Sequence, residues 1–443
     1  MFSARKLSPK FIFESLKEKA DIKKIVSNAG WLFIDRIFRM GVGLLVGLWI
    51  ARYLGPEQYG LLNYAQAFIA LFSAFATLGL DGIVIRNLLN EPDKKEELLG
   101  TAFALKFIGG LLVFILSVTL TIIIGDFSEN YLRIWLIFFV SLGVVFQSFD
   151  VIDFWFQSQI QSKYTVIAKG LSFTIISLFK VVLILFKANL MAFAIAGLLE
   201  VLLGALFLIA AFKIKGNSIS RWKFKKSVAI SLLKDSWPLI LSGLAVTLYM
   251  RIDQVMIGNM LGDRENGLYT AAVKLVEMWY FIPTSIVAST FPVIIKLRKQ
   301  NLSLYLKRLQ QLYNLMTWLG ILIAVVITIF SKQIILLLYG EGYSKSSFVL
   351  SISVWAGIFV FQGVARGNWI QAENLQRYSY WYTLIGCIVN IVLNLITIPK
   401  YGIYGAAVST LISQFVVAIV APSFFKETRL SSKMILKSFL WGK

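Results

Sequence analysis

Twelve long apolar stretches divide this 443-residue chain, and most of the connections between them are short and polar. An α-helix needs about 20 mainly apolar residues to cross the hydrocarbon core of a bilayer. Hydrophobic residues make up 58% of the chain, and its mean hydropathy is +0.75. We therefore predict an all-α integral membrane protein with twelve transmembrane helices. The predicted spans are 28–51, 61–84, 99–124, 131–154, 165–187, 190–212, 236–260, 267–290, 311–338, 346–369, 379–398 and 401–424.

The basic residues are distributed unevenly between the connections. Most of the 44 lysines and arginines lie in the two termini and in the second, fourth, sixth, eighth and tenth connections. Short cytoplasmic loops of membrane proteins carry an excess of lysine and arginine, so this pattern predicts that both termini face the cytoplasm. The net charge of +21 is then a signal of topology. It does not predict a nucleic-acid-binding surface, because no soluble module is present to carry one.

The expected organisation is two pseudo-symmetric six-helix lobes. An N-terminal segment, 1–27, is polar and basic and is predicted to lie as an amphipathic helix at the cytoplasmic surface. The first lobe covers 28–212 and the second covers 236–424. A linker at 213–235, with seven basic residues, joins them, and 425–443 forms a cytoplasmic tail.

A repeated motif supports this division. Leu-Gly-x4-Gly-Leu occurs at 54–61 and again 207 residues later at 261–268. Glycine permits tight backbone turns, so each copy is predicted to form an external elbow between two spans. Parallel repeats of this kind are a transporter architecture, although two glycine turns can also match by chance. The glycines of the two elbows are Gly55, Gly60, Gly262 and Gly267.

Residue types that usually carry enzyme chemistry are scarce. The chain has no histidine, which removes the commonest general base and metal ligand, and Cys387 is its only cysteine. It contains no phosphate-binding loop of the G-x-x-x-x-G-K-[ST] type. The sequence therefore favours transport over catalysis, and it predicts neither a metal site nor a resident cofactor.

Span one carries three ionisable residues, Asp35, Arg36 and Arg39. On an α-helix, Asp35 and Arg39 lie about 40° apart and Arg36 lies about 60° further round, so one sector holds all three. An ionisable side chain at the membrane centre costs about 2.5–3.5 kcal/mol, and it normally faces a cavity or a partner. Two interpretations stay open. One is an inward-facing cationic patch, and the other is a local Asp35–Arg39 ion pair that leaves Arg36 to snorkel.

Two lysines extend the basic set within the first lobe. Lys106 of span three stands beside Gly109 and Gly110, which favours a place on a cavity wall. Lys180 of span five lies at a depth comparable to that of Glu200 in span six. A structural Lys180–Glu200 pair and a functional role for these two residues are equally compatible with the sequence.

In the second lobe, span seven carries Arg251 and Asp253, and span eight carries Lys274 and Glu277. The i, i+3 spacing of Lys274 and Glu277 predicts a local ion pair. Taken together, the basic residues predict a predominantly cationic cavity between the lobes. Guanidinium groups bind phosphate groups well and organic cations badly, so the expected cargo is anionic or amphiphilic.

Four motifs follow one another in a characteristic order. They are Leu54-Gly55-x4-Gly60, Leu78-Gly79-Leu80-Asp81, Tyr249-Met250-Arg251-Ile252-Asp253-Gln254 with Gly262-x4-Gly267, and Tyr401-Gly402-Ile403-Tyr404-Gly405-Ala406-Ala407. In this order they resemble the Wzx-type polysaccharide flippases of the multidrug/oligosaccharidyl-lipid/polysaccharide exporter superfamily. The resemblance covers essentially the whole chain. It implies alternating access and transfer of an undecaprenyl-diphosphate-linked oligosaccharide to the outer leaflet of a bacterial cytoplasmic membrane, for cell-surface polysaccharide biosynthesis.

The resemblance also implies roles for individual residues. Related lipid II flippases carry an arginine–aspartate pair in their first helix that is thought to engage the diphosphate, and Asp35 and Arg36 occupy a similar place in reversed order. Arg36 and Arg39 are accordingly expected to contact phosphate, and Arg251 is expected to close the gate from the other lobe. The expected substrate-binding residues are Arg36, Arg39, Lys106, Lys180 and Arg251, and the expected ion-coupling or orienting residues are Asp35 and Glu200.

The expected partners are membrane lipids, the lipid-linked oligosaccharide and polysaccharide assembly proteins, and coupling to Na⁺, H⁺ or the membrane potential stays open. Two alternatives remain. One is a multidrug or cation antiporter of the same superfamily, which Arg36 and Arg39 disfavour because they would repel a cationic drug. The other is a membrane-embedded polysaccharide polymerase or ligase, which the short external loops and the absence of histidine disfavour.

Overall fold

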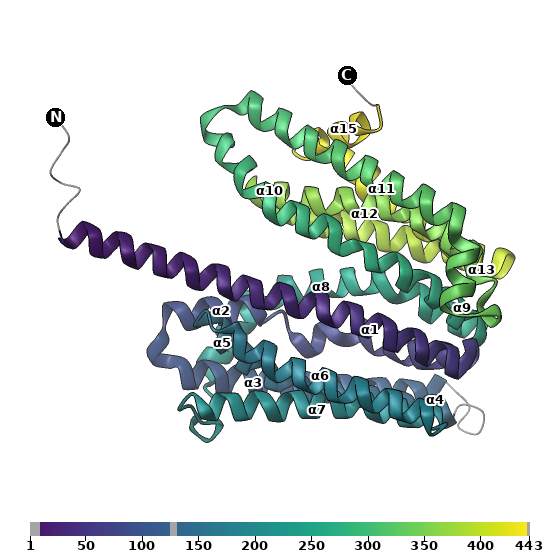
Figure 1. Cartoon of the computed structure of the whole chain (residues 1–443), viewed down its shortest axis with the longest axis horizontal. Helices are drawn as coiled ribbons and strands as arrows, with labels where there is room; N and C mark the ends of the chain where they lie inside the picture. Colours follow the sequence, from purple (N-terminus) through teal and green to yellow (C-terminus); the bar gives the residue numbers. More distant parts are fainter. Residues whose placement is uncertain (1–8, 125–130, 441–443) are drawn as a thin grey trace. The chain divides into compact units, whose positions relative to one another are not determined.

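The computed structural model describes residues 9–124 and 131–440, and within them side chains from residue 27 onward except at 124, 292 and 299. Every secondary-structure element in these ranges is helical (Figure 1). The predicted amphipathic surface of 1–27 lies outside the described side chains. The α-helices are α1 (Pro9–Thr77), α2 (Asp81–Asn90), α3 (Lys95–Ile124), α4 (Tyr131–Phe146), α5 (Val151–Ser158), α6 (Ser162–Leu185), α7 (Leu190–Ile214), α8 (Lys226–Met260), α9 (Asp263–Glu277), α10 (Phe281–Gln300), α11 (Leu302–Leu338), α12 (Ser346–Ala372), α13 (Gln376–Phe415), α14 (Ala421–Ser423) and α15 (Arg429–Ser438). The 3-10 turns are η2 (Pro92–Lys94), η3 (Gln147–Asp150), η4 (Ile219–Arg221), η5 (Met278–Tyr280) and η6 (Glu341–Tyr343), and η7 (Val416–Val420) is π-helical.

The length and composition of these helices give a membrane-spanning architecture. In the described part of the chain, ten helical stretches are long and apolar enough to cross a bilayer. Two of them, Ser27–Asn90 with 64 residues and Gln376–Ser423 with 48 residues, each contain two predicted spans. A glycine with a non-helical backbone, Gly55 or Gly402, interrupts each of these two stretches. The predicted all-α membrane fold is confirmed, and the ten stretches are consistent with twelve spans.

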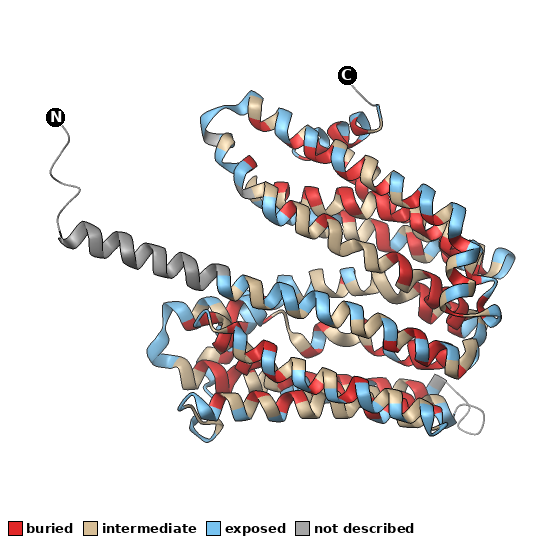
Figure 2. Cartoon of the chain, in the orientation of Figure 1, coloured by how far each residue is buried: buried red, intermediate tan, exposed pale blue. Residues whose placement is uncertain are grey.

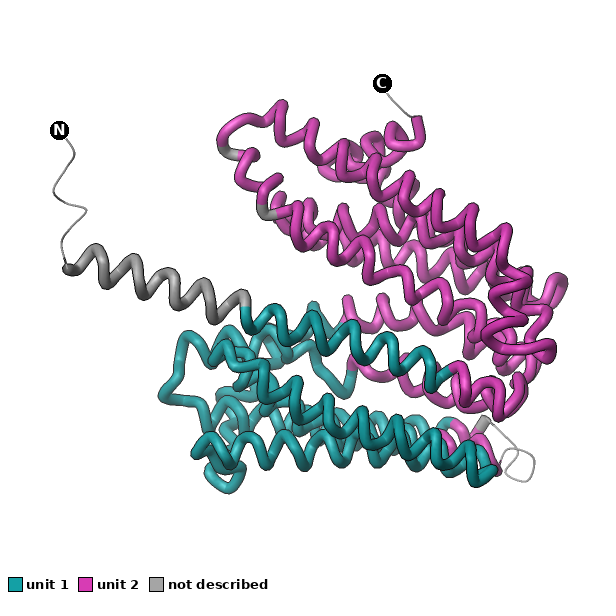
Figure 3. Tube along the Cα trace, in the orientation of Figure 1, with its two compact units in different colours: residues 1–47, 75–120, 138–240 teal, residues 48–74, 121–137, 241–443 magenta. Residues whose placement is uncertain are grey.

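The chain forms two compact units, which Figure 3 colours separately. Because the units are defined by contacts, α1, α3, α4 and α8 contribute residues to both. The predicted lobes at 28–212 and 236–424 follow the sequence repeat instead, and they stay a prediction. Unit 1 comprises Met1–Gly47, Phe75–Leu120 and Phe138–Ile240, and unit 2 comprises Leu48–Ala74, Thr121–Ile137 and Leu241–Lys443.

In unit 1, α6 packs against α7 and α2 packs against α5. The predicted linker contains a short connection between Ile214, where α7 ends, and Lys226, where α8 begins. This connection is tied to the start of α3, because the backbone N–H of Lys223 donates to the carbonyl of Glu96 at 3.1 Å. Gly100 permits the close approach, since a Cβ there would lie 2.6 Å from the Lys223 nitrogen.

In unit 2, α12 packs against α9, α11 and α13, and α15 packs against α11. A buried arginine joins two of these helices. Arg366 of α12 donates to the carbonyl oxygens of Ala418 at 2.6 Å and Val417 at 2.9 Å, both in the π-helical turn η7. Its guanidinium also lies 5.1 Å from the ring centre of Tyr382. Arg366 therefore links α12 to both α13 and η7 within unit 2.

Exposed residues recur along the long helices (Figure 2). Many of them are large and apolar. Leu178 of α6 is 64% exposed and Leu337 of α11 is 74% exposed. Exposed apolar area costs about 25 cal/mol per Å² in water, whereas lipid tails are as apolar as leucine. These faces therefore suit contact with lipid.

Candidate functional site

The two copies of the Leu-Gly-x4-Gly-Leu motif break the helical backbone in the same way. The first glycine of each copy has a positive φ, +72° at Gly55 and +92° at Gly262. The second glycine, Gly60 or Gly267, is helical and buried. In each copy the first position therefore favours glycine because its φ is positive, and the second favours glycine because a neighbouring backbone packs closely against it.

The second glycines bring the two motif copies into direct contact within unit 2. A Cβ at Gly60 would lie 1.8 Å from the carbonyl oxygen of Asp263, and a Cβ at Gly267 would lie 1.8 Å from that of Pro56. Pro56 and Asp263 occupy equivalent positions in the two copies, so the contact is reciprocal, like an isologous interface between subunits. The Asn266 side chain also donates to the carbonyl of Gly60 at 2.9 Å. We call this reciprocal packing the elbow contact.

The five predicted substrate-binding residues do not form one site. Arg39 lines a cavity in unit 1, and Lys180 is ion-paired with Glu200, which lines the same cavity. Lys106 lies elsewhere in that unit. Arg251 belongs to unit 2. Arg36 is exposed, and it makes no ion pair with the described residues.

Lys106 is buried next to a carboxylate and an aromatic ring. Its exposed fraction is 4%. The ammonium nitrogen lies 3.8 Å from a carboxylate oxygen of Asp81 and 4.7 Å from the ring centre of Phe154. Both contacts hold the lysine between the helices of unit 1.

The local ion pair in span one, one of the two interpretations left open by the sequence, is formed. Arg39 Nε donates to both carboxylate oxygens of Asp35, at 2.8 and 2.9 Å. The guanidinium lies 5.2 Å from the ring centre of Phe173. Arg39 Nη2 is buried and has no hydrogen-bond partner among the described protein atoms.

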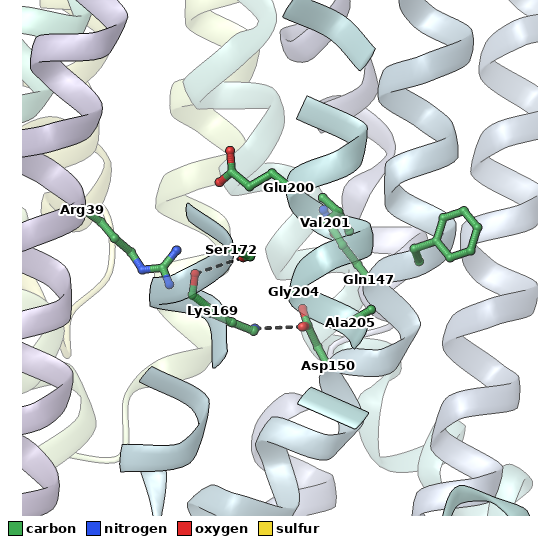
Figure 4. A pocket seen from close by; sticks show the side chains of 10 residues that line it. Arg39, Gln147, Asp150, Lys169, Ser172, Glu200, Val201, Gly204 and Ala205 are labelled. Atoms are coloured by element: carbon green, nitrogen blue, oxygen red, sulfur yellow. Dashed lines mark hydrogen bonds and ion pairs between the residues drawn. The ribbon is translucent and has the colours of Figure 1, made fainter. Parts of the chain in front are cut away.

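A polar cavity of about 180 Å³ lies inside unit 1 (Figure 4). Four of its lining side chains are charged, and each comes from a different element. They are Arg39 of α1, Asp150 of η3, Lys169 of α6 and Glu200 of α7. Side chains that are distant in sequence thus converge on one space among helices with membrane-spanning composition.

Each charged side chain on the cavity wall has a partner of opposite sign. The two basic and two acidic lining side chains balance in formal charge. This cavity therefore differs in character from the cationic cavity expected between the lobes. The ion pairs are Arg39–Asp35, Lys169–Asp150 and Lys180–Glu200, each at 2.8 Å.

Local backbone structure explains how the cavity forms. Helix α4 ends at Phe146, and a 3-10 turn precedes α5. Side chains at i and i+3 eclipse in a 3-10 turn, so Gln147 and Asp150 point the same way. Small residues leave the space open, since a Cβ at Gly204 would already lie 3.3 Å from the Ser172 hydroxyl oxygen. Figure 4 shows these side chains around the cavity.

Reasoning from the sequence did not select Lys169 or Asp150 for this site. A usable signal was present for the lysine. Lys169 precedes Lys180 by eleven residues, which is about three turns of helix, so both lysines lie on one face of α6. Asp150 offered no comparable signal, because its direction depends on the 3-10 turn.

In unit 2 the predicted Lys274–Glu277 pair is wrong. Glu277 instead accepts a hydrogen bond from Arg251 at 3.2 Å, across from α9 to α8. Lys274 makes no ion pair with the described residues, and its ammonium lies 5.0 Å from the ring centre of Tyr59. Glu277 thus pairs with the longer Arg251 side chain on the neighbouring helix and not with Lys274 three residues before it.

A second polar centre in unit 2 surrounds Asp253, which is 5% exposed. Three neutral groups donate to its carboxylate. They are the hydroxyl of Tyr269 at 2.8 Å, the hydroxyl of Thr410 at 2.5 Å and the amide of Asn394 at 2.6 Å. Asp253 makes no ion pair with the described residues, so no basic side chain compensates its charge. Burying an unpaired carboxylate is costly, and a proton or a bound cation relieves that cost.

The oxygen content of this centre suits a hard cation. Asn394 also donates to the side-chain oxygen of Asn390 at 3.1 Å. The side-chain oxygen of Asn394 is buried without a hydrogen-bond donor among the described protein atoms. Hard cations prefer carboxylate, amide and hydroxyl oxygens. The sequence identified Asp253 as a charge within a span but gave no indication of this environment.

Comparison with known families identifies the group to which the protein belongs. The family described as "polysaccharide biosynthesis protein" matches residues 25–298, more than half of the chain. This chain therefore belongs to the polysaccharide biosynthesis protein family, and the recognition of a polysaccharide-related membrane protein from its motifs is confirmed.

Individual relatives cover almost the whole chain. The capsular polysaccharide biosynthesis protein CapF of Staphylococcus aureus is 24% identical over 420 residues, which are 91% of this chain and 99% of that protein. The probable low-salt glycan biosynthesis flippase Agl15 of Haloferax volcanii is 26% identical, over 93% of this chain and 85% of that protein. Among solved structures, the lipid II flippase MurJ in an inward closed conformation has the same fold. Its TM-score is 0.69 at 17% identity, over 92% of this chain and 90% of that one.

Proposed function

We propose that this protein transfers an undecaprenyl-diphosphate-linked oligosaccharide from the cytoplasmic to the outer leaflet of a bacterial cytoplasmic membrane by alternating access. The family and the names of its relatives support this class of cargo. The uneven distribution of basic residues supports an orientation with both termini in the cytoplasm. The oligosaccharide is destined for a cell-surface polysaccharide.

The ion-paired cavity of unit 1 is the observation that carries the proposal. Buried ion pairs contribute little to stability, because desolvation offsets their attraction. Polar groups inside a membrane normally mark a pathway for substrates or ions. A cavity with both signs of charge among apolar helices therefore supports the handling of polar cargo inside the bilayer.

Arg36 is the candidate contact for the diphosphate. Its guanidinium is exposed and has no carboxylate partner among the described residues. Arg39, by contrast, is bound by Asp35. A free guanidinium offers bidentate hydrogen bonds to phosphate oxygens, which supports assigning the diphosphate to Arg36.

Asp253 is the candidate coupling group. A carboxylate held by neutral donors gains or loses a proton, or a sodium ion, without breaking a permanent ion pair. Loading and unloading of that cation would bias unit 2 between two arrangements by differential affinity. This assignment supports coupling to H⁺ or Na⁺ through Asp253 in preference to Asp35 and Glu200, which are already paired.

Leaflet transfer in proteoliposomes tests the function directly. The full chain is reconstituted with lipid-linked oligosaccharide extracted from membranes of the source cells, and a membrane-impermeant reagent reports its appearance outside. Arg36→Ala is expected to lower the transfer rate about tenfold or more, the value of one charge-assisted contact. Lys94→Ala, at an exposed lysine paired only with Glu91, serves as the control.

Three results would contradict parts of the proposal. Absence of transfer by the wild type, with efflux of organic cations instead, would identify an antiporter. Bond formation between sugars without transfer would identify an enzyme. Equal rates for Arg36→Ala and Lys94→Ala would remove Arg36 from the diphosphate site and leave the flippase function intact.

A further inference from the structure

We propose that the cavity of unit 1 is a subsite for one sugar ring of the cargo and that it does not receive the diphosphate. The inference rests on the proposed flippase function and names the part of the substrate that this cavity recognises. Four residues carry it: Arg39, Gln147, Asp150 and Lys169, all of which line the cavity.

The charges on the wall oppose both kinds of ion. A phosphate group in the cavity would be repelled by the carboxylates of Asp150 and Glu200, and it could bind Arg39 or Lys169 only by drawing them away from their carboxylate partners. A cation would meet Arg39 and Lys169 in the same way. A neutral ligand meets neither repulsion, because each of these charges is already balanced by its partner.

A polyhydroxylated ring uses both kinds of group at once. Each sugar hydroxyl both donates and accepts, so it bonds to carboxylate oxygens and to guanidinium or ammonium hydrogens. Arg39 Nη2 is buried without a protein acceptor and is available for such a bond. Gln147 is exposed, and its side chain makes no hydrogen bond with the described residues, so its amide offers two donors and an acceptor to a ligand.

The size of the cavity agrees with a sugar ring. Its volume of about 180 Å³ is many times the ~10–15 Å³ that a single water requires, so the cavity has room for a ring that carries several hydroxyl groups. Helix packing alone would close this space with apolar side chains. Instead a 3-10 turn directs Gln147 and Asp150 toward it, and Gly204 and Ser172 keep it open.

Equilibrium binding to the purified full chain tests the inference with two matched probes. One is the lipid-linked oligosaccharide extracted from source membranes, and the other is the same lipid after enzymatic removal of its sugars. The cavity variants are Gln147→Leu and the charge-neutral double variant Lys169→Gln/Asp150→Asn. Each is expected to weaken binding of the sugar-bearing lipid about tenfold, and to change binding of the bare polyprenyl diphosphate less than about twofold.

Two further variants calibrate the measurement. Arg36→Ala is expected to weaken binding of both lipids by the same factor, because both carry the diphosphate. Lys94→Gln/Glu91→Gln removes an exposed ion pair of 2.6 Å outside the cavity and is expected to change neither affinity. This control matches the double variant in the number of charges removed.

The binding results distinguish a failure of the sugar subsite from a failure of the flippase function. Equal losses for both lipids in the cavity variants, or a loss confined to the bare lipid, would assign the cavity to the diphosphate and overturn the inference. Unchanged affinity for both lipids would overturn it as well. If the wild type bound neither lipid, the proposed flippase function itself would fall.

Discussion

Three partly buried carboxylates of unit 1 and the buried Asp253 of unit 2 are stabilised in different ways. In unit 1, Asp35, Asp150 and Glu200 each lie 2.8 Å from a basic side chain. In unit 2, the described hydrogen-bond donors to Asp253 are two hydroxyls and an amide, all neutral. A basic side chain is part of the protein, so it stays near its carboxylate throughout a transport cycle. Neutral donors instead leave a carboxylate able to bind and release a mobile cation. This difference is why we propose Asp253 as the coupling group and the cavity of unit 1 as part of the cargo site.

Removing the charge of Asp253 is the strongest way to break this comparison. Asp253→Asn keeps the size of the side chain and removes its affinity for a cation. Gradient-driven transfer in proteoliposomes is expected to fall about 100-fold, which corresponds to ~2.7 kcal/mol. Transfer without a gradient is expected to persist. If the variant kept the wild-type response to Na⁺ and pH gradients, Asp253 would not be the coupling group.

Breaking one pair in unit 1 tests whether its charges are permanent partners. Lys180→Met leaves Glu200 without a counter-charge, and we expect a loss of about 2 kcal/mol in the free energy of unfolding, because the site is only partly buried. The double variant Lys180→Met/Glu200→Leu is expected to recover most of that loss. Thermal unfolding in detergent completes the double-mutant cycle. Strict additivity of the two single changes would mean that the pair contributes no coupling.

Removing one hydrogen-bond donor to Asp253 should change transfer less than removing the charge of Asp253. Tyr269→Phe removes one of the three neutral donors to the carboxylate. The ion concentration that gives half-maximal transfer is expected to change between about five- and tenfold, equivalent to ~1–1.4 kcal/mol. Tyr305→Phe, which removes a hydroxyl bonded to Glu373, is the matched control and should leave this concentration unchanged. Identical behaviour of the two variants would remove Tyr269 from the coupling site.

The smallest expected change sharpens the comparison inside unit 2. The Lys274 ammonium lies over the ring of Tyr59 and pairs with no carboxylate among the described residues. Lys274→Met therefore loses a cation–π contact, but it also removes the cost of keeping a charge away from water, and the two effects offset each other. We expect its free energy of unfolding to stay within about 0.5 kcal/mol of the wild type. Arg251→Met should be clearly less stable, since it leaves Glu277 unpaired. Chemical or thermal unfolding of the two variants side by side decides this, and the reverse order of stability would contradict the observed pairing.

The sequence predicted features that depend on local chain properties. Apolar stretches gave the spans, because membrane thickness fixes their length. The glycine motifs predicted the breaks at Gly55 and Gly262, since few other residues adopt such a backbone. Partners of long charged side chains were harder to predict, because they depend on how neighbouring helices are registered. Glu277 illustrates this, as its partner is 26 residues away on α8 and not three residues away on α9.

The candidate site was predictable in part for the same reason. Arg39, Lys180 and Glu200 were selected because charges are rare within apolar spans. Asp150 was not selected, because it lies near the cytoplasmic end of predicted span 131–154, where a charge at the membrane interface is ordinary. A short 3-10 turn, which helical periodicity does not reveal, decides where its side chain points. The neutral donors to Asp253 were not predicted either, since threonine, asparagine and tyrosine are common and carry no distinctive pattern.

The elbow contact depends more on the number of residues between the two glycines of each motif copy than on which residues they are. The four residues between the glycines are Pro-Glu-Gln-Tyr in one copy and Asp-Arg-Glu-Asn in the other, and no position is shared. Yet Gly60 meets Asp263 and Gly267 meets Pro56 at the same distance of 1.8 Å from a hypothetical Cβ. Inserting or deleting one residue in either copy would shift both halves of the contact together. The two copies therefore differ at every position between their glycines and agree in the spacing of those glycines.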